Sequence, residues 1–393
     1  MSGHGVKRYK TRGKLVSYFP KPKGRSGAKF STPSAFISLP DELLLEVVNS
    51  YPRVSLHTKR TALYGEEYLV RHRSIYALSQ TCRRLRNVFL PYVWQSIEAF
   101  ASKYQVDDPA KPNRMNLPDG ILWKKELATD LVRQLEIVTI RDPTLAPYVQ
   151  TVTVWLSDYS WAGVWPEFCR ALAELPNLHT LHIVYSMQAT GRWIFEKRSF
   201  LEMLDRRSLP SVRNLAIPWK LANLLPSMPE TQRLYFTDAT PRQFSNGLTE
   251  PTKAGFAKLR ELPNTVFTLT SNNLFELCGG RLKHIQVRLH EHRAKGDVEA
   301  QRIQQRFTKM AKRLRGLESL KVFSDESYDD IAFWADCTML LIQPLEAVLR
   351  ARAVPNSSAP NDAEPSTRTV RVTLVHRSGA RKTVIAAAGQ DDP

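Results

Sequence analysis

The sequence predicts a chain of mixed α and β structure, an α+β arrangement in which a small helical unit precedes a longer α/β region. Two patterns predict it. Helix-type apolar spacing fills residues 36 to 100, and a short strand-forming pattern recurs between residues 115 and 350. The composition agrees, because 393 residues with 42% hydrophobic content can bury the cores of two or three soluble domains.

The first 34 residues form a basic arm. Residues 1 to 30 contain nine Lys or Arg residues and no Asp or Glu, which is half of the net charge of +18. Glycine and proline interrupt the arm repeatedly, so we expect it to be disordered. Three interpretations stay open: a nuclear-import signal, a contact with nucleic acid, or a solvated tail without a dedicated partner.

The first helix is predicted within residues 38 to 52, "SLPDELLLEVVNSYP". Pro40 suits the first helical position, because its missing N–H would have no partner there. The two acidic residues that follow favour the positive end of the helix dipole. Leu43 and Val47 lie four residues apart on one apolar face, and Pro52 ends the helix.

A second helix is predicted at residues 74 to 89. Its apolar residues recur at spacings of three and four, at Ile75, Leu78, Cys82, Leu85 and Phe89. Pro91 then breaks the pattern, and a short third helix follows with Trp94 and Ile97 one turn apart. A unit of about 60 residues buries only about 60% of its unfolded surface. Part of its apolar face is therefore left for a partner, or for packing against the rest of the chain.

These residues resemble the F-box, a helical motif whose pattern opens with Leu-Pro-x-Glu-Leu-Leu and reaches Cys-Arg-Arg-Leu-Arg before a final Trp. The matching residues here are Leu39, Pro40, Glu42, Leu43 and Leu44, then Leu78, Cys82, Arg83, Arg84, Leu85 and Arg86, then Trp94. The family usually has a short turn between its first two helices, whereas this chain inserts a loop of residues 53 to 73. A longer surface loop costs little closure entropy, so the fold can accept it.

The resemblance implies a non-enzymatic, fungal-type substrate-recognition subunit of a Skp-cullin-F-box ubiquitin ligase. Such a subunit bridges a Skp-type adaptor, and through it cullin, to a target protein that is then degraded. The adaptor contacts that the resemblance implies are Leu39, Pro40, Leu43, Val47, Ile75, Leu78, Cys82 and Leu85. Two other functions stay open: a basic nucleic-acid-binding protein, and a scaffold that binds the adaptor without serving a ligase.

A second pattern recurs in five full copies and one weaker copy that begins with Thr231: an apolar residue, two variable residues, an apolar residue, one variable residue and an apolar residue. The copies lie at Val149, Val152 and Val154; Leu178, Leu181 and Ile183; Val212, Leu215 and Ile217; Thr231, Leu234 and Phe236; Leu282, Ile285 and Val287; and Leu317, Leu320 and Val322. The last two members of each copy alternate, as a half-buried strand requires. Helix-compatible stretches lie between the copies.

These copies resemble leucine-rich repeats, in which each unit adds one strand to a curved parallel sheet. The copies start 29, 34, 19, 51 and 35 residues apart, against roughly 20–29 in regular members. A further copy near Phe267 and Leu269 would split the longest interval. The expected fold is therefore an irregular leucine-rich-repeat-like α/β solenoid over residues 115 to 350, the alternative being an unrelated α/β domain.

In such a solenoid the variable residues beside each strand line one exposed face that would bind the target. The candidates on this face are Thr153, His182, Arg233, Tyr235, Gln286 and Lys321. Two tryptophans just after the first copy, Trp155 and Trp161, are further candidates, because tryptophan is favoured at interfaces. Burial in the core is the alternative for both.

The C-terminal part begins with a Pro- and Ser-rich stretch, residues 354 to 367, which is typical of a linker. Residues 369 to 388 then contain two β-rich runs around Ser378 and Gly379, which predict a terminal hairpin within the segment 368 to 393.

No catalytic, cofactor or metal motif is recognisable. The sequence lacks Gly-x-Gly-x-x-Gly, a Walker-type loop, Gly-x-Ser-x-Gly and His-Glu-x-x-His. Its four cysteines are far apart, which argues against a disulfide framework and fits a reducing compartment. With no apolar run of membrane-spanning length, we expect a cytoplasmic or nuclear protein without membrane association.

Overall fold

We describe a computed structural model of the chain. It describes residues 39–51, 66–99, 121–157, 159–186, 202–204, 208–237, 248–267, 277–289, 297–324, 337–353, 369–376 and 380–387. The basic arm, the linker and most of the expected 53–73 loop lie outside the described residues.

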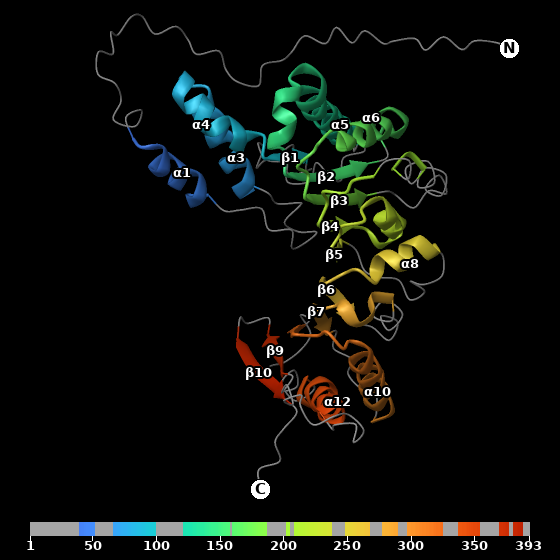
Figure 1. Cartoon of the computed structure of the whole chain (residues 1–393). Coiled ribbons are helices and arrows are strands. Elements are labelled where there is room, and N and C mark those ends of the chain that lie inside the picture. The colour runs from blue at the N-terminus through green and yellow to red at the C-terminus, as the bar shows by residue number, and fades with distance from the viewer. Residues whose placement is uncertain are drawn as a thin grey trace, which may run out of the picture.

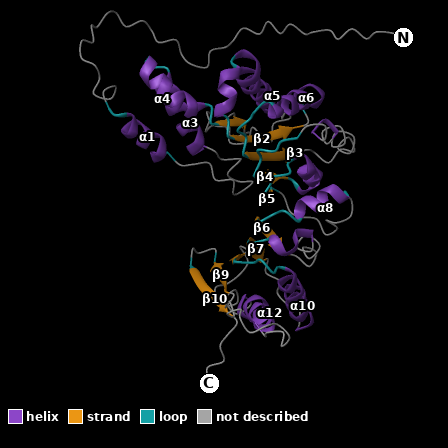
Figure 2. Ribbon diagram, viewed as in Figure 1, coloured by secondary structure: helices purple, strands orange, loops and turns teal. Residues whose placement is uncertain are grey.

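The chain has an α/β fold built on one ten-stranded sheet whose strands are ordered as in the sequence. Strands β1 to β9 are parallel, and β10 pairs with β9 in the antiparallel direction. The strands stack one after another from β1 to β10, and helices α5, α6, α8 and α10 lie along one side of the stack (Figures 1 and 2). The bounds are β1 Ser96–Ala99, β2 Thr151–Ser157, β3 Thr180–Ser186, β4 Asn214–Ile217, β5 Arg233–Phe236, β6 Glu261–Phe267, β7 His284–Leu289, β8 Ser319–Ser324, β9 Thr369–Val375 and β10 Arg381–Ala387.

Three helices precede the first strand: α1 Asp41–Ser50, α3 Glu66–Ser79 and α4 Arg83–Val93. Helical segments connect most of the strands, as parallel pairing requires. Their bounds are α5 Ile121–Glu136, η3 Ile137–Arg141, η4 Pro143–Tyr148, α6 Trp161–Ala173, η5 Trp219–Ser227, α8 Glu250–Phe256, η6 Gly279–Arg281, α10 Asp297–Arg313, η7 Thr338–Ile342 and α12 Gln343–Ala353. None of the described helices is both long enough and apolar enough to cross a membrane.

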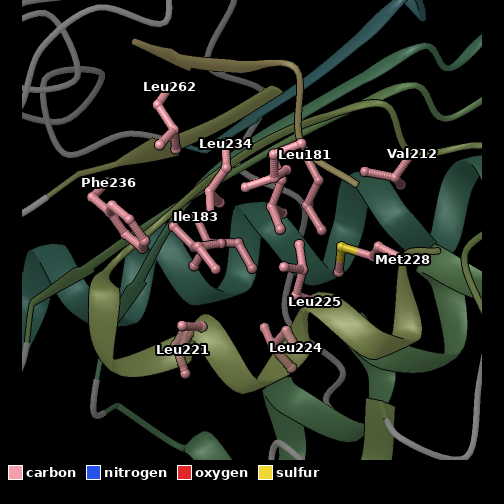
Figure 3. Close-up of a cluster of buried hydrophobic side chains, with 14 of the residues drawn as sticks. Leu181, Ile183, Val212, Leu221, Leu224, Leu225, Met228, Leu234, Phe236 and Leu262 are labelled. Carbon is pink, nitrogen blue, oxygen red and sulfur yellow. The ribbon is translucent and has the colours of Figure 1, made fainter. Parts of the chain in front are cut away.

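The main core lies between the sheet and the helices that connect its strands. The second apolar residue of each predicted repeat stands beside its counterpart on the next strand: Val152 pairs with Leu181, Leu181 with Leu215, and Leu215 with Leu234. Figure 3 shows two members of this row, Leu181 and Leu234, on the side of the sheet that faces Leu221 and Leu224 of η5. Because each fully buried Leu or Val contributes about 1.5–3 kcal/mol, the rows fix both the register and the face of the sheet.

All six predicted repeats coincide with strands, but the longest interval between them is divided at a different place from the one predicted. Strand β6 covers Glu261–Phe267, with Leu259 and Leu262 buried in the repeat positions. Phe267 is only the last residue of this strand, and Leu269 lies outside the described residues. The pattern of Leu259 and Leu262 is present in the sequence, but the proline after Leu262 masks its alternation.

The predicted helices near the N-terminus need three corrections. Residues 74 to 89 are not one helix: α3 ends at Ser79, and α4 begins after Cys82, whose extended backbone interrupts the helix. Pro91 does not end α4, because the helix continues to Val93. The segment with Trp94 and Ile97 is not a third helix, since Ile97 belongs to strand β1.

The C-terminal runs form the antiparallel pair β9 and β10, and this hairpin is continuous with the sheet. Strand β9 pairs in parallel with β8, so that Val372 extends the apolar row of Leu320. The side chains of Val370, Val372 and Leu374 are buried in the main core. The hairpin thus contributes the last two strands of the sheet and does not form a separate unit.

Candidate interaction surfaces

Helices α1, α3 and α4 enclose a small core of their own, distinct from the core of the sheet. It consists of Leu44, Val48, Ile75, Leu85, Phe89 and Val93. The side chain of Trp94 packs against both cores, at the junction between α4 and strand β1. The three short helices are therefore held together by six buried side chains, and Trp94 joins their core to that of the sheet.

The start of α1 is fixed against α4 by one arginine. The guanidinium of Arg84 donates hydrogen bonds to the carbonyl oxygen of Leu39, at 2.6 Å, and to Asp41 Oδ1, at 2.9 Å. An exposed ion pair of this kind contributes at most about 1 kcal/mol. Its main effect is on geometry, because it fixes the position of the start of α1 relative to α4.

The structure divides the eight predicted adaptor contacts into two groups. Ile75 and Leu85 belong to the internal core and are each 1% exposed, so they cannot contact a partner while the helices stay packed. The other six reach the surface to different degrees: Pro40 and Leu43 are exposed, and Leu39, Val47, Leu78 and Cys82 are half-buried.

The remaining six side chains and Val70 are apolar and reach the surface of these helices, and three of them, Leu39, Leu78 and Cys82, also pack against the small core. Leu43 is 50% exposed, a large value for leucine in a folded helix. Val70 of α3 is 56% exposed and is a residue that sequence reasoning misses, because the sequence places it in the inserted loop. We call the exposed and half-buried residues Leu39, Pro40, Leu43, Val47, Val70, Leu78 and Cys82 the helical patch.

The predicted target-binding face of the sheet is closed over its first strands. Thr153, Trp155, His182 and Tyr235 are all at least nine-tenths buried. Thr153 and His182 are register partners on β2 and β3, so they form a continuous buried row with Tyr235 two strands further on. The prediction that Thr153, His182 and Tyr235 are exposed is wrong, and Trp155 follows the alternative of burial in the core. Alternation along a strand shows which residues leave the core face, but it does not show what covers the other face.

Two neighbouring residues in this row each bury a polar atom that has no hydrogen-bond partner among the described residues. The atoms are Thr153 Oγ1 and His182 Nδ1. Burial lowers the pKa of His182 to about 4, so its imidazole is neutral at physiological pH. Buried polar groups without partners are rare in folded proteins, and here both arise because polar residues occupy the covered face of two adjacent strands.

The same face is open over the later strands. Gln286 and Lys321 are register partners on β7 and β8 and are half-buried. The Lys321 ammonium lies 4.9 Å from the ring centre of Phe323, within reach of a cation–π contact. Arg233 is exposed but forms an ion pair with Glu261. Trp161 starts helix α6, and its side chain lies outside the described part of the structure.

No group of three His, Cys, Asp or Glu side chains among the described residues could hold a metal ion. Cys169, Cys278 and Cys337 are buried, and burial raises the pKa of Cys278 well above its ordinary value. The Cys278 thiol therefore stays protonated and unreactive at neutral pH.

Comparison with models of known protein families finds no match for this chain. Comparison with curated protein sequences finds none either.

Proposed function

We propose that the chain is an F-box-type receptor, in which the helical patch binds a Skp-type adaptor and the sheet carries the target. The observation that carries the proposal is the division of apolar residues within α1, α3 and α4. Six side chains are fully buried in the internal core, while Leu43 and Val70 remain at least half exposed. Exposed apolar residues grouped on one small unit are typical of a surface that a partner covers.

The shape of the unit suits a helical partner. Two short helices with apolar residues at helical spacing can form an interface with the helices of another protein. Leu43 and Val47 are one turn apart on α1, and Leu78 and Cys82 lie at the end of α3 and the start of α4. The Arg84 hydrogen bonds hold α1 in position before the partner binds, which reduces the entropy lost on binding.

The sheet suits the role of a target-binding scaffold. Its sequential parallel order supports the expected leucine-rich-repeat-like solenoid, in which each strand and its connection form one repeat. Because the first strands are covered, the target would bind along the open strands β7 to β9, where Gln286 and Lys321 are accessible. The proposed target-binding surface is therefore the open part of this face, and it is smaller than the full row of side chains that the sequence predicts.

The proposed mechanism is proximity. The chain would hold a target at a fixed distance from the ligase components that the adaptor recruits, and so raise the effective concentration of the target's lysines near the charged ubiquitin carrier. The covalent chemistry would belong to those partners, and this chain would supply only two binding surfaces.

A binding titration tests the adaptor surface. Purified full-length chain is titrated with a purified Skp-type adaptor, and so is a variant that carries Leu43→Asp and Leu78→Asp. A charge placed in an apolar interface costs several kcal/mol, so the variant is expected to bind at least about a hundredfold more weakly. The matched control is Ile385→Asp on β10, where a similarly exposed apolar residue lies far along the chain from the helices.

Equal binding by the folded double variant would remove the helical patch as the adaptor site. Loss of binding in the Ile385→Asp control would show that the effect of the double variant is not local.

A further inference from the structure

A row of arginines lies at the end of the sheet where the parallel strands begin. Its members are Arg213, Arg260, Arg281, Arg315 and Arg371, and we call them the basic rim. All five are exposed, and none forms an ion pair with another residue that the structure describes. They are far apart in the sequence, so no charge run marks them there.

Backbone hydrogen bonds bring the members of the rim together. The amide of Gln232 donates to the carbonyl of Arg213 at 2.9 Å, and the amide of Arg260 donates to Gln232 at 2.8 Å. The amide of Lys283 then donates to Arg260 at 2.8 Å, which continues the row into β7. Adjacent strands are about 4.8 Å apart, and one strand, β5, lies between Arg213 before β4 and Arg260 before β6.

The turns before β7 and β8 add the next two arginines. Gly316 packs so closely on the preceding turn that a Cβ atom on it would lie 2.3 Å from the carbonyl oxygen of Gly280. Arg281 and Arg315 are the chain neighbours of these two glycines, and the close backbone contact therefore places them side by side. Arg371 completes the rim, since its amide donates to the carbonyl of Glu318 at 3.0 Å.

The carboxylates at this end of the sheet do not balance the rim. Glu261 is paired with Arg233, and Glu318 with Lys283, each across adjacent strands. Glu230 is exposed in the turn before β5. Each paired carboxylate is thus matched by a further cation, which leaves five arginines against one remaining glutamate among the described residues here.

The pKa values of two titratable groups beside the rim are lowered, and one of them is affected by a rim residue. Burial and then the positive charge of Arg213 lower the pKa of His179, which lies next to the first rim residue. The hydrogen bond from Lys283 lowers the pKa of Glu318, and the charges of Lys283 and His284 act in the same direction. The Arg213 contribution to the His179 shift and the Lys283 and His284 contributions to the Glu318 shift are those expected beside positive charges.

We propose that the basic rim binds an extended, Asp- and Glu-rich segment of a target protein, a proposal that rests on the proposed function. Guanidinium groups match carboxylates in a bidentate geometry, and all five rim cations are arginines. Single-stranded nucleic acid also needs aromatic side chains on which bases stack. Among the described Phe, Trp and Tyr residues the one exposed side chain is Tyr148, which precedes β2 and not the strands of the rim.

A peptide-binding experiment tests the rim on the full-length chain. The probes are a fluorescent Asp- and Glu-rich peptide, its Asn and Gln counterpart, and a single-stranded oligonucleotide of equal net charge. The test variant combines Arg260→Gln, Arg281→Gln and Arg315→Gln. The control combines Lys125→Gln, Arg133→Gln and Arg350→Gln, three exposed cations on α5 and α12 that remove the same net charge.

The acidic peptide is expected to bind the wild type and the control equally, and the rim variant about tenfold more weakly, since each exposed charge pair contributes up to about a factor of five. The neutral peptide should not bind. Equal loss in both variants, equal binding of the neutral peptide, or tighter binding of the oligonucleotide would each overturn the proposal. The rim variant should keep its affinity for a Skp-type adaptor, so a failure of the rim and a failure of the adaptor site give different results.

Discussion

The side-chain amide of Gln134 forms with the backbone of Glu98 the two hydrogen bonds that a neighbouring strand would form. Gln134 Nε2 donates to the carbonyl oxygen of Glu98 at 2.9 Å, and the Glu98 amide donates to Gln134 Oε1 at 3.3 Å. Glu98 lies in β1, the first strand of the sheet. Helix α5 therefore closes an edge that would otherwise present its backbone groups to other chains.

We expect Gln134→Leu to destabilise the fold by about 1–2 kcal/mol, because it removes the side chain that satisfies both backbone groups of Glu98. Urea unfolding would measure the loss. Arg133→Gln, on the exposed face of the same helix, should change stability by less than about 0.5 kcal/mol. Equal stability of the Gln134→Leu variant and the wild type would mean that solvent satisfies this edge as well as the glutamine does.

The division of the helical residues into core and surface predicts opposite phenotypes for two substitutions. Ile75→Ala removes a side chain from the small core and should cost about 2–5 kcal/mol, seen as faster hydrogen exchange throughout α3 and α4. Leu43→Ala should change stability by less than about 1 kcal/mol, since half of its side chain is already in solvent. Similar exchange rates in the two variants would contradict the assignment of Ile75 to the core.

Burial of His182 predicts a pH dependence of stability. Its pKa is lowered from 6.5 to about 4 in the fold, so between these values the unfolded chain binds a proton that the folded chain does not. Protonation of His182 therefore does not reduce the free energy of unfolding above pH 6.5. As pH falls from 6.5 toward 4, it lowers this free energy by on the order of 3 kcal/mol. Thermal unfolding of His182→Leu should show a flatter profile over this range, and identical profiles would show that His182 does not titrate as described.

The close contact between the turns that contain Gly280 and Gly316 predicts that replacing Gly316 lowers the stability of the fold. Gly316→Ala forces a Cβ atom against the carbonyl of Gly280 and should cost about 1–3 kcal/mol. Gly163→Ala is the matched change, because a Cβ there would meet nothing closer than 3.8 Å, and alanine favours the helix. Chemical denaturation of both variants checks this. A stable Gly316→Ala variant would show that the two turns can separate without cost.

Strand positions are predictable because the apolar residues of the repeats carry two signals at once. Val152, Leu181 and Leu215 alternate within their own strands and also occupy one row across the sheet, so local pattern and tertiary packing agree. Strand β1 follows the same pattern with Ile97 and Ala99, preceded by Trp94. The sequence nevertheless predicts a helix there, because a spacing of three residues fits both a helix and a repeat.

The errors in the site have a different origin. The apolar spacing of α3 continues into α4 through Cys82, so sequence periodicity does not reveal the break. Which of Leu43 and Ile75 faces solvent depends on how the helices pack, which the spacing of either helix alone cannot determine. Burial of Thr153 and His182 likewise results from long-range packing on a face that alternation marks only as facing away from the core.

Affinity purification with quantitative mass spectrometry tests the central claim most directly. The tagged wild-type chain and the Leu43→Asp, Leu78→Asp variant are recovered in parallel from cells that contain Skp-type adaptors and cullins. We predict that the wild type retains both the adaptor and cullin, and that the variant loses both while it keeps partners bound to the sheet. Recovery of the wild type without an adaptor, or of the folded variant with undiminished adaptor, would contradict the account.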